Sequence, residues 1–262
     1  MKKILVYLII IILANNIVPL QAINNGENNK FNTDSLLSEA MKAYQKGEFE
    51  YAAKLYNTLY EAGFSSPELF YNLGNTYYKS NKIGLAILFY EKALLLKPND
   101  EDIKYNLDLA KTKIVDKPQE IDLSFITKIW NNIKNKLTLT QWGILSITLF
   151  CIFFITVVFF LISKSIIYKK ISFYSAIAII ILTIFSIIFT HQQYKTLNDS
   201  HFGIIMPPSV TIKASPDENS VNLFIVHEGT KIQITDTLNE WLEIRLSDGK
   251  TGWLKANQIQ KI

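Results

Sequence analysis

The sequence predicts a multidomain membrane protein that combines an all-α array of helical repeats, a two-helix transmembrane hairpin and a small all-β barrel. Three observations support this fold class. A pattern that recurs every 34 positions occupies the first half of the chain, two long uncharged runs lie in the middle, and short alternating segments fill the C-terminal part. These patterns are typical of a helical repeat array, of membrane-spanning helices and of β-strands, respectively. We therefore expect three separate structural regions.

Residues 1–22 have the three-part layout of a secretory signal peptide. Lys2 and Lys3 precede an apolar run at 4–14, and the small residue Ala22 ends the stretch. The apolar run is short for a bilayer span, which needs about 20 residues. We therefore expect residues 1–22 to direct export. The alternative is that they remain as an uncleaved anchor.

A helical array is predicted because small and large residues recur 34 positions apart. The recurring pairs are Ala40 and Gly74, Ala52 and Ala86, and Tyr56 and Tyr90. Small residues allow two helices to touch, and large ones fill the space between helices. The unit at 67–100 resembles the tetratricopeptide repeat through Leu73, Gly74, Tyr77, Ala86, Tyr90, Ala93 and Pro98. The array is expected over 33–115, with a weaker unit at 33–66 and a capping helix at 101–115, five helices in all.

The resemblance to this repeat implies a binding groove along the first helix of each unit. The expected lining residues are Leu37, Met41, Tyr44, Tyr71, Asn75, Tyr78, Tyr105 and Leu109. Tyrosine suits contact with a partner because it combines a large apolar area with a polar tip and loses little entropy. We expect the partner to be a peptide or a helix. In the alternative interpretation, several of these tyrosines pack only between repeats.

Two helices are predicted to cross the membrane, at 142–163 and 171–190. Uncharged runs occupy 143–162 and 171–190, and a helix of either length covers about 30 Å, which matches the hydrocarbon thickness. The connection at 164–170 contains three lysines and is expected in the cytoplasm. With an exported N-terminus, both soluble domains would then lie on the periplasmic side of a bacterial inner membrane.

Residues 121–137 are predicted to form an amphipathic helix before the first span. Phe125, Ile129, Ile133 and Leu137 recur at four-residue spacing and so share one face. Two interpretations fit this pattern. The helix lies in the membrane interface, or it is a linker helix packed on the first domain.

Short alternating segments at 209–216, 231–237 and 241–246 predict a small barrel over 204–262. Glycine, proline and aspartate mark the turns between them. The region resembles bacterial SH3-type domains through Gly229, Trp241, Gly249, Gly252 and Trp253. That resemblance implies an envelope-binding module.

Two tryptophans are the expected contact residues of the C-terminal domain. Trp241 and Trp253 offer large rings on neighbouring strands. In the alternative interpretation, one or both fill the core of the barrel. His227 and Glu228 are expected to form a surface pair in a turn.

The order of the parts adds a resemblance of the whole chain. An export signal, repeats with YNLGN at 71–75, IVDK at 114–117, a two-span hairpin and a domain with SPDENS, LF and HEGTK resemble the BatE membrane proteins of the aerotolerance operon. The resemblance implies an envelope complex with von Willebrand A-type proteins and other repeat membrane proteins encoded alongside. It does not supply a biochemical activity.

No constellation of residues in the sequence predicts catalysis, a metal or a cofactor. His191, His201 and His227 lack the spacing of metal ligands, and the single cysteine, Cys151, lies in an apolar run. A nucleic-acid partner is not expected, because the basic excess flanks the apolar runs while both polar parts are mildly acidic. The sequence favours a non-catalytic scaffold that binds protein partners beside the lipid bilayer. The alternative is an anchor that binds peptidoglycan through its C-terminal domain.

Overall fold

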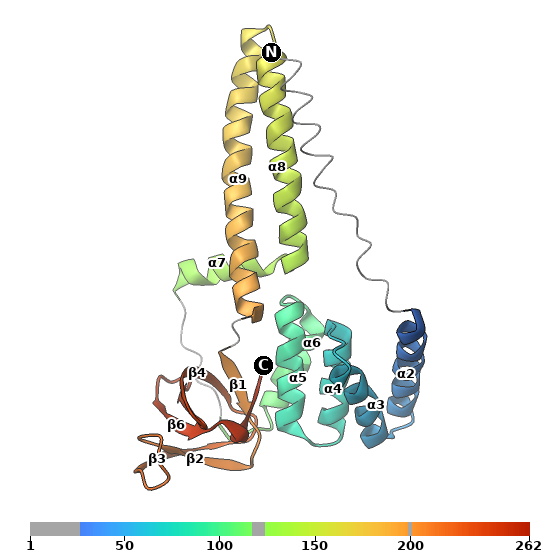
Figure 1. Cartoon of the computed structure of the whole chain (residues 1–262), viewed down its shortest axis with the longest axis vertical. Helices are drawn as coiled ribbons and strands as arrows, with labels where there is room; N and C mark the ends of the chain where they lie inside the picture. The colour runs from blue at the N-terminus through green and yellow to red at the C-terminus, as the bar shows by residue number, and fades with distance from the viewer. Residues whose placement is uncertain (1–26, 117–123, 199–200) are drawn as a thin grey trace. The chain divides into compact units, whose positions relative to one another are not determined.

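The computed structural model describes residues 27–116, 124–198 and 201–262 (Figure 1). The expected signal peptide at 1–22 lies outside these residues. The described residues divide into two compact units, one that includes 140–190 and one that includes 35–116, 124–139, 191–198 and 201–262. The first unit contains most of two long apolar helices. The second contains most of the helical array, a short amphipathic helix and a β-sheet.

The two apolar helices are α8 (Leu139–Ile162) and α9 (Ile166–Asn198), and both are long and apolar enough to cross a membrane. Ser146 Oγ lies 2.8 Å from Ser186 Oγ, so a polar contact joins the helices between apolar side chains. The connection is shorter than the expected 164–170. Lys169 N donates to the Ser165 carbonyl, so the helix already includes both Lys169 and Lys170, in keeping with the good helix propensity of lysine.

Among the described residues, the helical array contains five helices. They are α2 (Glu27–Gln45), α3 (Phe49–Glu61), α4 (Pro67–Lys79), α5 (Ile83–Leu96) and α6 (Glu101–Lys111). Ser66 Oγ accepts from Leu69 N at 3.1 Å and caps α4, with Pro67 at the first helical position. Gly47 and Asn81, which are one repeat period apart, both have positive φ, at 81° and 58°. A residue in the left-handed conformation therefore occupies the equivalent position of the turn in both units.

The recurring residues of the repeat pattern form the core of the array. Ala40, Ala52 and Ala86 are completely buried. Tyr56 and Tyr90 are only 2% and 1% exposed. Gly74 allows the closest approach, because a Cβ there would lie 2.5 Å from the Tyr90 ring. The pairing of small with large residues that predicted the array therefore positions its helices.

The C-terminal part is one antiparallel sheet in the order β3-β2-β6-β5-β4-β1-β7. Its strands are β1 (Phe202–Ile205), β2 (Ser209–Lys213), β3 (Asn222–His227), β4 (Lys231–Leu238), β5 (Trp241–Arg245), β6 (Thr251–Lys255) and β7 (Ile259–Lys261). Alternate residues of β2 and of the first half of β4 are buried, as the sequence pattern predicts. In β5 the predicted Leu242 and Ile244 are buried, and so is Trp241. Among the described strands β3 and β7 remain edges, so the sheet is not closed into the expected barrel.

Strand β1 belongs to two cores at once. Ile205 packs in the core of the sheet, whereas its neighbour Ile204 packs with the buried residues of the helical array, and both are completely buried. This is possible because successive side chains of a strand point to opposite faces, and β1 packs against α5. Ile262 and Ile114 also belong to the helical core. The array and the sheet are therefore continuous in their packing.

The amphipathic helix α7 (Phe125–Asn135) falls inside the predicted range 121–137. It is hydrogen-bonded to the last turns of α9. Trp130 Nε1 donates to Gln192 Oε1 at 3.0 Å, and Gln193 Nε2 donates to the carbonyls of Lys134 and Leu137 at 2.8 and 2.7 Å. These bonds fix α7 to the segment of α9 that follows the apolar run.

Candidate functional site

The residues predicted to line a groove lie on α2, α4 and α6, the first helices of the repeat units. Two asparagines orient the tyrosines of this face. Asn75 Oδ1 accepts a hydrogen bond from Tyr90 Oη at 2.7 Å, and Asn106 Nδ2 donates to Tyr71 Oη at 2.7 Å. The rings of Tyr71 and Tyr90 lie 6.1 Å apart. Hydrogen bonds therefore hold a tyrosine layer in place between α4, α5 and α6.

The phenols of Tyr44, Tyr56 and Tyr90 remain neutral at physiological pH. Burial raises the pKa of Tyr90 and of Tyr44, and it raises the pKa of Tyr56 to about 12. A lysine also contacts the layer, since Lys113 Nζ lies 4.2 Å from the centre of the Tyr78 ring. The positive charge of Lys113 therefore lies over an aromatic ring of this face. Lys113 was not among the predicted lining residues, although it falls inside the predicted capping helix at 101–115; α6 itself ends at Lys111.

The predicted residues divide into two groups by exposure. Leu37, Tyr44, Tyr71, Asn75 and Tyr78 are half-buried and pack within the array. Met41, Tyr105 and Leu109 are exposed, with 46%, 68% and 38% of their surface accessible. The first group supports the face, and the second is accessible to a partner. We call these three residues, together with the hydrogen-bonded Tyr71 and Tyr90, the first-helix face.

The two tryptophans of the C-terminal domain differ in exposure. Trp241 is 8% exposed, and Lys255 Nζ lies 5.7 Å from the centre of its ring. Its burial leaves little surface for a ligand, contrary to the expectation of a contact residue. Trp253 is half-buried on β6, opposite Glu243 of β5 and Lys213 of β2. Only Trp253 of this pair presents substantial surface.

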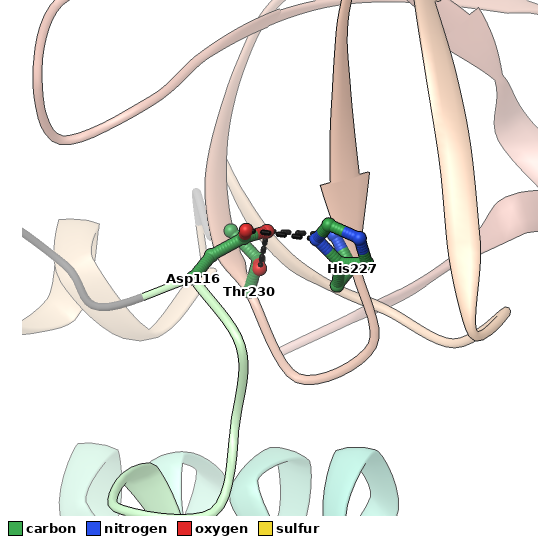
Figure 2. A network of polar contacts seen from close by, with 3 residues as sticks. All are labelled: Asp116, His227 and Thr230. Carbon is green, nitrogen blue, oxygen red and sulfur yellow. Dashed lines mark hydrogen bonds and ion pairs between the residues drawn. The ribbon is translucent and has the colours of Figure 1, made fainter.

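A polar joint connects the array to the sheet through Asp116 (Figure 2). Its carboxylate accepts from His227 N at 2.6 Å and from Thr230 Oγ1 at 2.8 Å, and it lies 2.8 Å from His227 Nδ1. Partial burial opposes the charge of Asp116, but these donors outweigh it and hold its pKa below the ordinary 3.8. His227 therefore pairs with Asp116. The expected surface pair of His227 with Glu228 is wrong.

A buried carboxylate forms the second part of this joint. Glu91 of α5 lies 2.7 Å from Lys231 Nζ of β4 and 3.1 Å from Lys111 Nζ of α6. Burial opposes its charge, yet the two lysines hold the pKa of Glu91 below its ordinary 4.5. A buried charge is tolerated when it is paired, so this triad fixes the position of β4 against both helices.

The turn at 228–229 completes the joint. Glu228 Oε1 accepts from Gly84 N at 2.9 Å, at the beginning of α5, where a carboxylate also favours the helix dipole. Gly229 has φ of +83°, and a Cβ there would lie 2.5 Å from Ile114. Glycine is therefore required twice, for the backbone conformation and for the close approach.

Two short segments quoted from the sequence thus meet in the structure. IVDK at 114–117 contributes Ile114 and Asp116, and HEGTK at 227–231 contributes its histidine, glutamate, glycine, threonine and lysine. Sequence reasoning singled out both segments but did not predict that they touch. The signal was present in their residue types: a lone aspartate after a capping helix and a turn rich in donors.

The described residues contain no group of three or more His, Cys, Asp or Glu side chains that could hold a metal ion. His191 and His201 lie in different segments, at the end of the apolar run and before β1. The candidate features among the described residues are therefore the first-helix face and the ion pairs of the polar joint.

Comparison with known proteins identifies one repeat. Residues 67–100 match the family model of the tetratricopeptide repeat, which confirms the prediction for α4 and α5. No curated protein matches the chain. Tetratricopeptide repeats are typically non-catalytic modules that bind protein partners, so the matched repeat indicates a protein-interaction role.

Proposed function

We propose that the chain is a non-catalytic membrane scaffold that binds protein partners through its repeat array. The first-helix face is the observation that supports this most directly. It combines exposed Met41, Tyr105 and Leu109 with a layer of tyrosines held by asparagines. Rigid aromatic residues with accessible neighbours are the composition of binding hot spots, and a peptide or a helix is the partner that fits.

The remaining parts of the proposal rest on the sequence resemblances. The apolar helices α8 and α9 anchor the chain in a bacterial inner membrane, with the array and an SH3-type domain at 204–262 in the periplasm. The partners are von Willebrand A-type and repeat membrane proteins of a BatE-type envelope complex. The polar joint supports a scaffold role, because it presents both modules to a partner in one fixed arrangement.

The test is crosslinking of the full-length chain in intact membranes, followed by measurement of crosslinked partner. We expect the double variant Met41→Ala/Tyr105→Ala to lower the yield by about thirtyfold or more, because truncated hot-spot residues each cost about 1–2 kcal/mol of binding, or about 2–4 kcal/mol for the pair. Both side chains are exposed, so the fold should be unchanged. Tyr51→Ala is the matched control, since Tyr51 is 46% exposed, as Met41 is, but lies on α3. An unchanged yield for the double variant, or an equal loss for the control, contradicts the proposal.

The alternative function, an anchor that binds peptidoglycan, depended on two tryptophans in the C-terminal domain. Trp241 is buried, so only Trp253 of the two remains to form such a surface. Among the described contacts of the sheet, none favours a glycan over a protein. We therefore retain the scaffold as the proposed function.

A further inference from the structure

A cavity of about 480 Å³ lies where α9 ends and the sheet begins. Its size is within the range of small-molecule sites. Its lining includes the apolar side chains of Leu95, Phe202 and Ile262, and the basic side chains of Lys134, Lys195, Lys231 and His201. An apolar interior beside several cations matches a ligand with an anionic head and an apolar tail.

The charged side chains that line the cavity have one sign. Its described lining contains three lysines and neither aspartate nor glutamate. The carboxylate of Glu91 lines an adjoining cavity of about 240 Å³, and it is engaged by Lys231 and Lys111. An anionic group in the larger cavity would therefore be stabilised by the lysines around it.

The position of the cavity along α9 fits a lipid headgroup. The apolar run of this helix ends at Thr190, and Lys195 follows five residues later. At about 1.5 Å per residue, that separation is about 7 Å. The headgroup layer on each side of the hydrocarbon is about 5–8 Å thick. If α9 spans the bilayer, Lys195 lies at headgroup level.

The helix α7 lies at the same level and supplies Lys134 to the cavity. Its bonds to Gln192 and Gln193 connect it to the segment between Thr190 and Lys195. Phe125 and Ile126 are both 76% exposed, and Ile129 and Ile133 are exposed as well. Exposed apolar residues with lysines beside them are typical of a helix that lies in the membrane interface. This favours the interfacial interpretation of α7 over a linker helix.

We propose that this cavity binds an anionic phospholipid of the bilayer. Lys134 and Lys195 contact the headgroup phosphate, Leu95 and Phe202 contact the adjacent chain, and α7 lies in the interface beside them. The inference depends on the membrane anchoring in the proposed function but not on any protein partner. The proposal gives two of the lysines that flank the spans, Lys134 and Lys195, a role in binding lipid.

The experiment uses the full-length chain in nanodiscs of phosphatidylcholine with one fifth phosphatidylglycerol. Lipid that stays with the protein after mild detergent extraction is counted by native mass spectrometry. We expect phosphatidylglycerol to be retained, and Lys134→Gln/Lys195→Gln to weaken retention by about thirtyfold, because each lysine near an anionic headgroup contributes about fivefold. Lys164→Gln/Lys170→Gln is the matched control, because both lysines lie at the connection between the two spans, away from the cavity. This variant should retain the lipid.

Three outcomes would overturn the assignment. They are equal retention of both lipids by the wild type, equal loss in the control variant, and displacement of the lipid by millimolar inorganic phosphate. The last outcome would show that free phosphate is the ligand. Unfolding temperatures of both double variants establish that the fold persists. Partner crosslinking through the first-helix face is measured separately, so failure of the lipid site and failure of the scaffold proposal are distinguishable.

Discussion

Asp116 joins two segments that are far apart in the sequence. Its carboxylate contacts a backbone N–H, an imidazole nitrogen and a hydroxyl group, all in the 227–230 turn region. Hydrogen bonds to a charged acceptor are stronger than neutral ones. Glu91 has the same role on the other side of the joint, where two lysines approach it. At this scale, two carboxylates determine how the array and the sheet meet.

These carboxylates predict a loss of stability in acid. Asp116 and Glu91 both have lowered pKa values in the folded protein, so the unfolded chain binds more protons as the pH falls below about 4.5. Their contribution to the free energy of unfolding is fully present above that pH and is lost as the pH falls through the lowered values. Urea unfolding of the full-length chain in detergent, between pH 3 and pH 7, measures it.

The variant Asp116→Ala isolates one carboxylate. We expect it to lower the free energy of unfolding at pH 7 by about 1–2 kcal/mol, since His227 and Thr230 lose a charged acceptor but water partly replaces it. Its stability should also fall less steeply in acid than that of the wild type. Asp108→Ala, an exposed carboxylate on α6, is the control. A variant whose acid dependence equals that of the wild type would show that Asp116 does not contribute.

At the scale of elements, the close approach of α4 and α5 depends on a single glycine. Alanine at position 74 would gain about 1 kcal/mol in helix propensity, but its Cβ would lie 2.5 Å from the Tyr90 ring. That ring is buried and hydrogen-bonded to Asn75, so it has little freedom to move. Steric conflict therefore outweighs propensity.

We expect Gly74→Ala to lower the free energy of unfolding by about 1–3 kcal/mol, the usual cost of overpacking a core. Thermal unfolding followed by circular dichroism in detergent provides the measurement. Gly143→Ala is the control, because no atom lies within 4 Å of a Cβ at that position. A Gly74→Ala protein that unfolds at the wild-type temperature or above would contradict this account of the packing.

The elements that the sequence predicted are those with a long or repeated pattern. The repeat at 67–100 was predictable because Gly74, Ala86 and Tyr90 report helix contacts that recur in the preceding unit. Strands β1 and β7 were not predicted, since FGII and IQK are too short to show alternation and are defined by pairing with distant strands. The same limit applies to the polar joint, whose two halves carry no local information about each other.

Membrane orientation belongs to the scale of the whole molecule. If α8 and α9 form a hairpin across the inner membrane, the array and the sheet lie on one side and the connection at 163–165 on the other. The prediction uses single cysteines at Glu61, Asn219 and Lys164, all exposed positions, in a chain with Cys151→Ser. We expect an impermeant maleimide to label the first two from the periplasm, and Lys164→Cys only after the inner membrane is opened. Labelling of Glu61→Cys without Asn219→Cys would contradict a shared compartment.

Strand β1 places Ile204 and Ile205 in two different cores, and this has a thermodynamic consequence. Melting the sheet would withdraw Ile204 and Ile262 from the interior of the helices, so neither module can lose its structure while the other keeps all of its own. A molecule bound to either module therefore raises the melting temperature of both. Occupancy at one end can in this way be communicated to the other without any displacement of the backbone.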